Sequence, residues 1–468
     1  MRFVDSTELR AGFAARLSTL YGTEVPAYTT LVDVSHEVNQ RVMRRDPEAA
    51  QRLGTIARVT AERHGAIRVG SPAELAQVAR IFGALGMYPT GFYDLRDARP
   101  RPIPVISTAF RPTDRAELAR NPFRVFTSML VPEDGRFFDT DLAQRLRTFV
   151  GGRRLFGDEL LTLADHAEAE GGLKETDAER FLTLATAAFA LSPEPVDRAW
   201  YSELERVSDV AADIGGVTST HINHLTPRVL DIDDLYADMS SRGIAMIDRI
   251  QGPPRWEGPD VLLRQTSFRA LSEPRRFREP DGSVRDGELR VRFGEVEARG
   301  VALTPAGRDL YDRLVAAVDE RTAARPDDDR QDVAAEVWRE GMPRTERELA
   351  ERELAFFTYR VRENGPAGPP PATASAADLI TGGWVEPEPI VYEDFLPRSA
   401  AGIFASNLSG AGHLDTDEGG TDRDLAWLSG AVDREIHVPE ELYRAESEAS
   451  LAAALAELGT TPRPSSPA

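Results

Sequence analysis

Seven histidines and no cysteine limit any metal site in this sequence to histidine and carboxylate ligands. His64 and Arg68 lie in the segment RHGAIRVG, 63–70, whose composition predicts a short strand. Because alternate residues of a strand share a face, the two side chains would point the same way. That arrangement would suit a metal ligand beside a group that binds an anion. Spacing alone favours the plainer alternative, an edge strand with two solvated polar residues.

Two more histidines, His221 and His224, lie three residues apart in HINHLT. On a strand they would face opposite sides, so only one could reach a metal shared with another strand. Either could instead be a core or turn histidine that meets its hydrogen-bonding needs locally. Spacing does not choose between them.

The segment ELRVRFGEVEAR, 288–299, alternates as a strand, and Glu295 and Glu297 continue the face formed by its apolar residues. A carboxylate on a buried face is costly unless it is paired or bound to a metal. If the strand leaves the core at this point, both carboxylates are solvated instead. The pattern is equally compatible with the two interpretations.

Two histidines and one carboxylate can form a facial triad, which suits non-haem Fe(II) and leaves coordination positions open. A 2-oxo acid could chelate the ion through its carboxylate and keto oxygens, with O2 in the remaining position. The sequence contains no GxSxG, Walker A, GxGxxG or HExxH motif. No other catalytic motif therefore competes with the metal hypothesis.

The elements that must position these residues mix helical and strand patterns. Helical periodicity covers 6–20 and 32–42, and a capping box at Ser71–Glu74 starts a helix that ends near 85. Three apolar, β-rich runs follow at 88–95, 103–110 and 123–131. This order predicts an α+β fold with an antiparallel or mixed sheet.

The middle of the chain changes from helical to strand patterns. Four helices are predicted in what we interpret as an insertion, at 142–150, 159–169, 177–191 and 196–212. Hairpin turns are predicted at Asp281-Gly282 and Asp286-Gly287, before the strand at 288–299. A helix should then begin at Thr304-Pro305 and end near 318.

These patterns divide the chain into four parts. We expect an N-terminal α+β region with the first ligand at 1–138, a helical insertion at 139–214, and a second β-rich region with the remaining ligands at 215–440. The last of these includes a low-complexity linker at 365–377. A C-terminal helix and a tail, disordered over the last nine residues, would complete the chain at 441–468.

The 468 residues are 41% hydrophobic and carry a net charge of −21. There is no basic stretch for nucleic acid and no apolar run of about 18 residues for a membrane. The N-terminus MRFVDSTELRAGF lacks an apolar signal core, so we expect a cytoplasmic protein. An anionic substrate would need a local arginine, because the overall field repels it. Nothing in the sequence indicates an oligomeric state.

Four segments resemble the 2-oxoadipate dioxygenase/decarboxylase family: RHGAIRVG (63–70), HINHLTPRVLDID (221–233), FGEVEARGVALTPAGRDLYD (293–312) and YEDFLPRSAAGIFASN (392–407). The resemblance extends from about residue 5 to 440. It implies a strongly curved, mostly antiparallel sheet around a metal, as in the vicinal-oxygen-chelate enzymes hydroxymandelate synthase and hydroxyphenylpyruvate dioxygenase. It also implies an Fe(II)-dependent reaction of lysine catabolism, in which 2-oxoadipate and O2 give D-2-hydroxyglutarate and CO2.

The resemblance also implies a ligand set. His64 matches the first iron-binding histidine of the family. His224 is chosen as the second, because NHLT resembles the Asp-His-Val start of metal-binding strands in related dioxygenases. Glu295 is chosen as the carboxylate, because F-x-E-x-x-x-R resembles the ligand strand of those enzymes.

For the substrate, the resemblance places a carboxylate-binding arginine at Arg68, four residues after His64. A looser match assigns the far carboxylate to backbone groups near Arg398 and Ser399. Two alternatives stay open: a vicinal-oxygen-chelate isomerase or lyase using Zn or Mn, and a non-catalytic, metal-stabilised binding protein. Oxygen consumption separates the first from a dioxygenase, and turnover separates the second.

Overall fold

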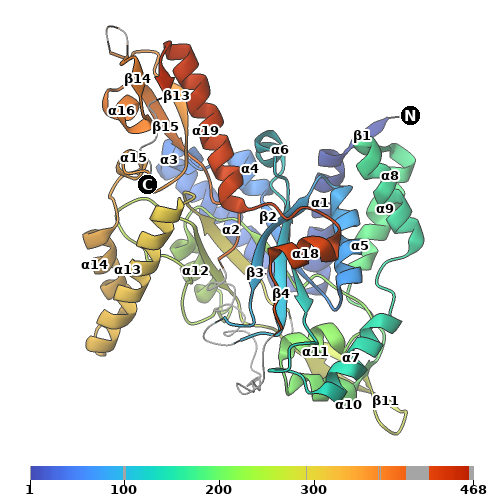
Figure 1. Cartoon of the computed structure of the whole chain (residues 1–468). Coiled ribbons are helices and arrows are strands. Elements are labelled where there is room, and N and C mark those ends of the chain that lie inside the picture. Colours follow the sequence, from blue (N-terminus) through green and yellow to red (C-terminus); the bar gives the residue numbers. More distant parts are fainter. Residues whose placement is uncertain are drawn as a thin grey trace.

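Helices and strands both contribute to the fold, as the α+β expectation required (Figure 1). The structure is a computed structural model that describes residues 2–98, 102–290, 292–366, 368, 370–396 and 421–462. The chain enters through β1 (Phe3–Asp5) and two long helices, α1 (Ser6–Glu24) and α2 (Pro26–Arg45). The Asp5 side chain caps α1 and Pro26 opens α2, which confirms both predicted helices and lengthens them.

A five-stranded sheet at the centre carries the first two candidate ligands. Its order is β3 (Tyr88–Asp94), β4 (Val105–Arg111), β5 (Arg124–Leu130), β2 (Arg63–Val69), β8 (His224–Pro227). β2 and β5 run parallel, and the other neighbours run antiparallel. The three strands predicted between 88 and 131 are confirmed. Four helices connect these strands or precede them: α3 (Pro47–Gln51), α4 (Ile56–Ala61), α5 (Pro72–Gly83) and α6 (Arg115–Arg120).

Residues 140–215 are mainly helical: α7 (Thr140–Gly152), α8 (Asp158–Glu170), α9 (Glu175–Ala188), α10 (Arg198–Glu205) and α11 (Asp209–Gly215). Strand β6 (Gly172–Lys174) pairs with β1. The single helix predicted at 196–212 is wrong. The segment begins with the short strand β7 (Val196–Asp197), which pairs with β10. Its helical part is divided into α10 and α11, because the Ser208 side chain accepts a hydrogen bond from the backbone N–H of Val210 and caps α11.

The strand predicted at 288–299 is also wrong, because it is two strands in different sheets. β11 (Val284–Leu289) pairs with β10 (Glu273–Arg278), whereas β12 (Glu295–Arg299) pairs with β9 (Leu263–Ser267). Between the two strands, the Arg292 side chain points inward and forms a buried ion pair with Glu273, 2.6 Å away. The turn at Asp281-Gly282 is confirmed by a φ of 83° at Gly282. The second predicted turn, at 286–287, is wrong, because both residues are paired within the β10–β11 ladder.

The C-terminal part packs beside the central sheet (Figure 1). It follows α12 (Ile232–Ser241) and contains α13 (Pro305–Ala324), α14 (Arg330–Gly341), α15 (Glu346–Glu351), β13 (Phe357–Val361), β14 (Thr373–Ala374), α16 (Ala376–Thr381), β15 (Val385–Pro389), α18 (Leu425–Val432), α19 (Pro439–Leu458) and β16 (Thr461–Pro462). The helix predicted from 304 is confirmed. β14 lies inside the expected linker and pairs with β16, so the tail is ordered as far as Pro462. The rest of the tail lies outside the described residues.

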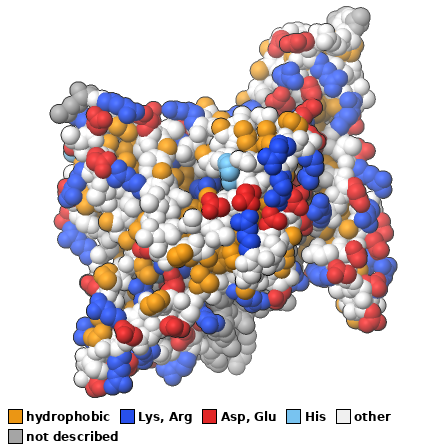
Figure 2. Space-filling model, turned by 180° about the vertical axis from the view of Figure 1, so that it is seen from behind, with side chains coloured by type: hydrophobic (Ala, Val, Ile, Leu, Met, Phe, Trp, Pro, Cys, Tyr) orange, Lys and Arg blue, Asp and Glu red, His pale blue; other side chains and the backbone are white. Residues whose placement is uncertain are grey.

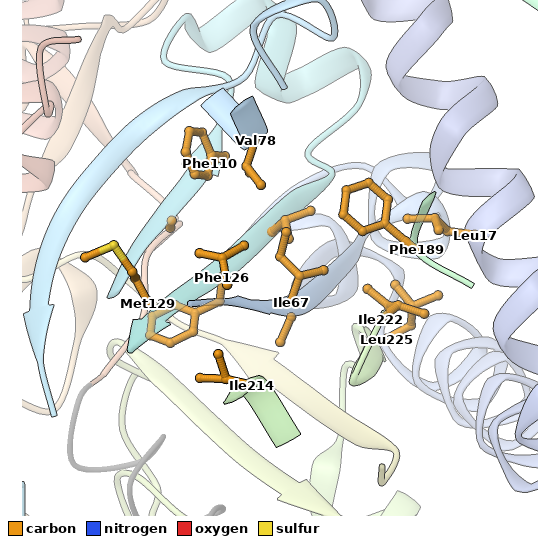
Figure 3. Close-up of a cluster of buried hydrophobic side chains, with 14 of the residues drawn as sticks. Leu17, Ile67, Val78, Phe110, Phe126, Met129, Phe189, Ile214, Ile222 and Leu225 are labelled. Carbon is orange, nitrogen blue, oxygen red and sulfur yellow. The ribbon is translucent and has the colours of Figure 1, made fainter. Parts of the chain in front are cut away.

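Two hydrophobic clusters form the core, one around the central sheet and one under α13, α14 and α19. Figure 3 shows Ile67 of β2 in the first cluster, with Val78 of α5, Phe189 and Leu225 around it. Ile67 is 1% exposed, and the opposite face of β2 carries His64 and Arg68, which are also buried. Since β2 is covered on both faces, these polar side chains need partners inside the protein.

Acidic and basic side chains lie side by side on the face shown in Figure 2, with hydrophobic side chains scattered between them. On this face the charges are therefore mixed, without a broad patch of one sign. Among the described residues, no helix combines the length and the apolar character needed to cross a bilayer.

Gly294, just before β12, offers a test of how tightly the candidate ligand strand is packed. A Cβ at this position would lie 1.9 Å from Cε1 of Phe268, which is buried. We expect Gly294→Ala to lower the free energy of unfolding by about 1–3 kcal/mol, measured by urea denaturation. Gly151→Ala on α7 is the matched control, because nothing lies within 4 Å of its new Cβ. Equal stability of the two variants would contradict this packing.

Candidate metal centre

His64, His224 and Glu295 come from three different strands and meet in the interior. One ligand atom from each lies within 4.8 Å of the other two. On β2 and β8, Ala66 stands opposite His224, so both histidines project from the same face of the sheet. β12 reaches the end of β8 through a bridge between Arg228 and Glu297. The pairing of these strands therefore builds the triad.

The atoms of the triad converge on one point. Glu295 Oε2 lies 3.0 Å from His224 Nε2 and 3.7 Å from His64 Nε2. The other oxygen of Glu295 accepts a hydrogen bond of 2.5 Å from Gln265 on β9. Both nitrogens of the buried His64 ring lack a hydrogen bond of regular geometry within the described part of the chain, and Nε2 is the one on the side of Glu295 Oε2. Two imidazoles and a held carboxylate with an unsatisfied nitrogen fit a divalent cation, and the donor set suits non-haem iron.

Burial and neighbouring charges act differently on the three groups. Burial, together with His64 and Arg68, lowers the pKa of His224 well below its usual value, so this ring is neutral. Burial also opposes charge on His64, but Glu297 and Glu295 outweigh it and raise its pKa. Burial raises the pKa of Glu295, and His64 offsets this only in part. A cation at the triad would supply the positive charge that this buried carboxylate lacks.

Two residues that the sequence left as possible ligands lie outside the triad. Glu297 Oε2 is 2.9 Å from His64 Nδ1, on the side of the ring away from Glu295. His221 Nε2 is 3.3 Å from a carboxylate oxygen of Asp213. β8 begins only at His224, so the strand-face comparison of the two histidines does not apply to His221. The solvated alternative for Glu295 and Glu297 is wrong, because both are buried.

Aromatic rings surround the triad. The Phe395 ring lies 5.0 Å from the His64 ring, and the Phe293 ring lies 5.3 Å from the His224 ring. Phe126 of β5 packs on Phe395, with centroids 4.9 Å apart. These rings keep water from the polar atoms and strengthen electrostatic interactions there. Phe395 and Phe126 were not identified from the sequence, since single aromatic residues carry no positional signal.

Arg68 also lies at this site, and its side chain is 4% exposed. It forms a buried ion pair with Asp213 of α11, and Asp213 also accepts a 2.9 Å hydrogen bond from Asn223. The positive charge of Arg68 contributes to the lowered pKa of His224, so Arg68 interacts electrostatically with the triad. Asp213 was not identified from the sequence. Its acidic side chain within the apolar helical run VAADIG was the available signal, because a buried acid needs a partner. Arg398 and Ser399 lie outside the described residues.

Comparison with known proteins finds similarity along nearly the whole chain. Residues 13–407 match the 2-oxoadipate dioxygenase/decarboxylase family. The 2-oxoadipate dioxygenase/decarboxylase of Mycobacterium tuberculosis is 56% identical over 442 residues, 94% of this chain and 97% of its own. That of Pseudomonas putida is 42% identical over 417 residues, 87% and 88% of the two chains. The crystal structure of the hydroxyglutarate synthase from Pseudomonas putida in complex with 2-oxoadipate matches with a TM-score of 0.81 at 37% identity, covering 98% of this chain and 99% of that one.

Proposed function

This chain belongs to the 2-oxoadipate dioxygenase/decarboxylase family, and on that basis we propose that it converts 2-oxoadipate and O2 to D-2-hydroxyglutarate and CO2 with Fe(II). The observation that carries the proposal is the buried group of His64, His224 and Glu295 in a chain so similar to named members. Its donor set suits an Fe(II) ion with open coordination positions.

His64, His224 and Glu295 would hold the iron. When bound, the iron supplies chelation of the 2-oxo acid and activation of O2. Gln265 fixes one oxygen of Glu295 and thereby aims the other at the imidazoles. The neutral state of His224 is the form that donates a lone pair to a metal.

The substrate has two carboxylates in a protein of net charge −21, so local cations must bind it. Arg68 would bind one carboxylate through its planar guanidinium, with Asp213 holding that guanidinium in place. Backbone groups near Arg398 and Ser399 would bind the far carboxylate. Phe395 and Phe293 keep water from the reacting end of the substrate.

The family resemblance has two further implications, for the shape of the sheet and for the enzyme's place in the cell. The central sheet would be strongly curved around the metal, in the manner of vicinal-oxygen-chelate enzymes. The enzyme would act in the cytoplasm, within lysine catabolism.

The test is to load the metal-free protein anaerobically with Fe(II) and ascorbate, add 2-oxoadipate and air, and measure O2 uptake and CO2 release. We expect both with Fe(II) and neither with Zn(II), which suits the ligand set but has no redox chemistry. Turnover with Zn(II) or Mn(II) in the absence of oxygen would instead favour an isomerase or lyase. Binding of 2-oxoadipate without turnover under any of these conditions would favour a binding protein.

A further inference from the structure

Glu297 lies on the far side of His64 from the triad. β12 projects Glu295 and Glu297 from one face, roughly 7 Å apart along the strand. This separation places one carboxylate at each edge of the same imidazole ring. Glu295 Oε2 lies 3.7 Å from Nε2, and Glu297 Oε2 lies 2.9 Å from Nδ1. Strand β12 therefore places one carboxylate near each ring nitrogen of His64.

Glu297 is itself held rigidly by Arg299, the next residue on the same face. The guanidinium donates two hydrogen bonds to the carboxylate, of 2.7 Å and 2.9 Å. Arg299 Nε also lies 3.3 Å from Glu62, which Arg228 and Arg124 pair from other sides. These five side chains are almost completely buried. A carboxylate fixed in this way cannot rotate away from His64 without breaking buried charge-assisted bonds.

Arg299 also binds the backbone that carries Phe395. Its Nη1 donates to the carbonyl oxygens of Tyr392 and Asp394, at 2.6 Å and 3.1 Å. Phe395 then packs edge-on against the His64 ring. One cation thus fixes both the carboxylate behind His64 and the aromatic side chain beside it.

We propose that Glu297 is a positioning residue for the metal centre, which accepts a hydrogen bond from Nδ1–H of His64 and so presents Nε2, unprotonated, to the metal. Arg299 holds Glu297, and the carbonyl groups of Tyr392 and Asp394, in the arrangement that this requires. A carboxylate behind a ligating histidine fixes its tautomer and ring orientation and makes the ring a stronger donor. This inference rests on the proposed role of His64 as a metal ligand.

The test compares Glu297→Gln with Glu393→Gln. Glu393 is a buried carboxylate of the same charged cluster, paired with Arg124 and Arg58, and it makes no ion pair with His64. Zn(II) and Co(II) affinities are measured against a chromophoric chelator, together with the visible spectrum of the Co(II) protein. We expect Glu297→Gln to weaken metal binding by about 10–100-fold and to alter the Co(II) spectrum. Glu393→Gln should change neither, even if it lowers stability.

Equal loss of affinity in the two variants would overturn the inference, because Glu297 would then only support the fold. Unchanged affinity and spectrum in Glu297→Gln would overturn it as well. The readout does not involve oxygen chemistry. If the wild type takes up O2 but Glu297→Gln binds metal normally, only the inference fails. If Glu297→Gln loses metal but the wild type takes up no O2, only the proposed function fails.

A second measurement needs no variant at Glu297, so poor folding of that variant would not prevent the test. With 15N-labelled histidine, NMR of the Zn(II)-loaded wild type reports which nitrogen of each ring carries the proton, and His64→Asn identifies the His64 signals. We expect His64 to be protonated at Nδ1 and coordinated through Nε2. Coordination through Nδ1, or a proton at Nε2, would overturn the inference.

Discussion

Replacing His64, His224 or Glu295 with alanine is expected to abolish iron binding and oxygen uptake while the protein stays folded. Each residue supplies one of the three converging ligand atoms. Loss of an outer hydrogen-bond partner alone typically costs about 10–100-fold in metal affinity, so loss of a ligand should cost at least about 100-fold. Metal content after anaerobic Fe(II) loading, O2 uptake and circular dichroism measure the three outcomes.

His221→Ala is the matched control for this set. It is another buried histidine, three residues from His224, but it lies against Asp213 and outside the triad. It should keep substantial iron. If His221→Ala loses the metal and His224→Ala keeps it, the ligand assignment is wrong. Unfolding of all the variants would instead mean that these buried polar side chains are needed for packing.

Local sequence patterns narrowed the choice of ligands, but the family resemblance made it. Spacing alone did not distinguish His221 from His224, nor a buried Glu295 from a solvated one. Strand parity placed His64 and Arg68 on one face of β2, and the structure has them there, buried. Parity also grouped Glu295 with Glu297, and both approach the same imidazole. Backbone geometry fixes the side-chain period at about 2 residues in a strand and about 3.6 in a helix, so these patterns can be recognised without knowledge of the fold.

What the sequence did not supply depends on contacts between distant segments. Asp213 pairs with Arg68, which is 145 residues away in the sequence, and no local pattern predicts that pairing. The break between β11 and β12 depends on the ion pairs that Arg292 forms with Glu273 and Glu24. In the sequence, Arg299 was only the end of a motif. In the structure it lies within a buried charged cluster, and alternation cannot show whether a charge is buried or solvated.

The second large effect is expected at Arg68. With iron bound, Arg68→Ala should lower kcat/KM for 2-oxoadipate by the equivalent of about 2–5 kcal/mol, because a buried substrate carboxylate would lose its cation. Arg68→Lys should be impaired less. It keeps the charge but loses the planar group that binds a carboxylate through two parallel hydrogen bonds. Steady-state oxygen uptake measures both variants, with iron content determined separately.

Asp213 complicates the interpretation of Arg68→Ala, because that variant also leaves a buried carboxylate without its ion pair. The double variant Arg68→Ala/Asp213→Asn removes this stranded charge and keeps a side chain of the same shape. If Arg68 binds substrate, the double variant should remain as impaired as Arg68→Ala. Recovery of near wild-type kcat/KM would show that Arg68 serves only to neutralise Asp213. That result would rule out Arg68 as the residue that binds a substrate carboxylate.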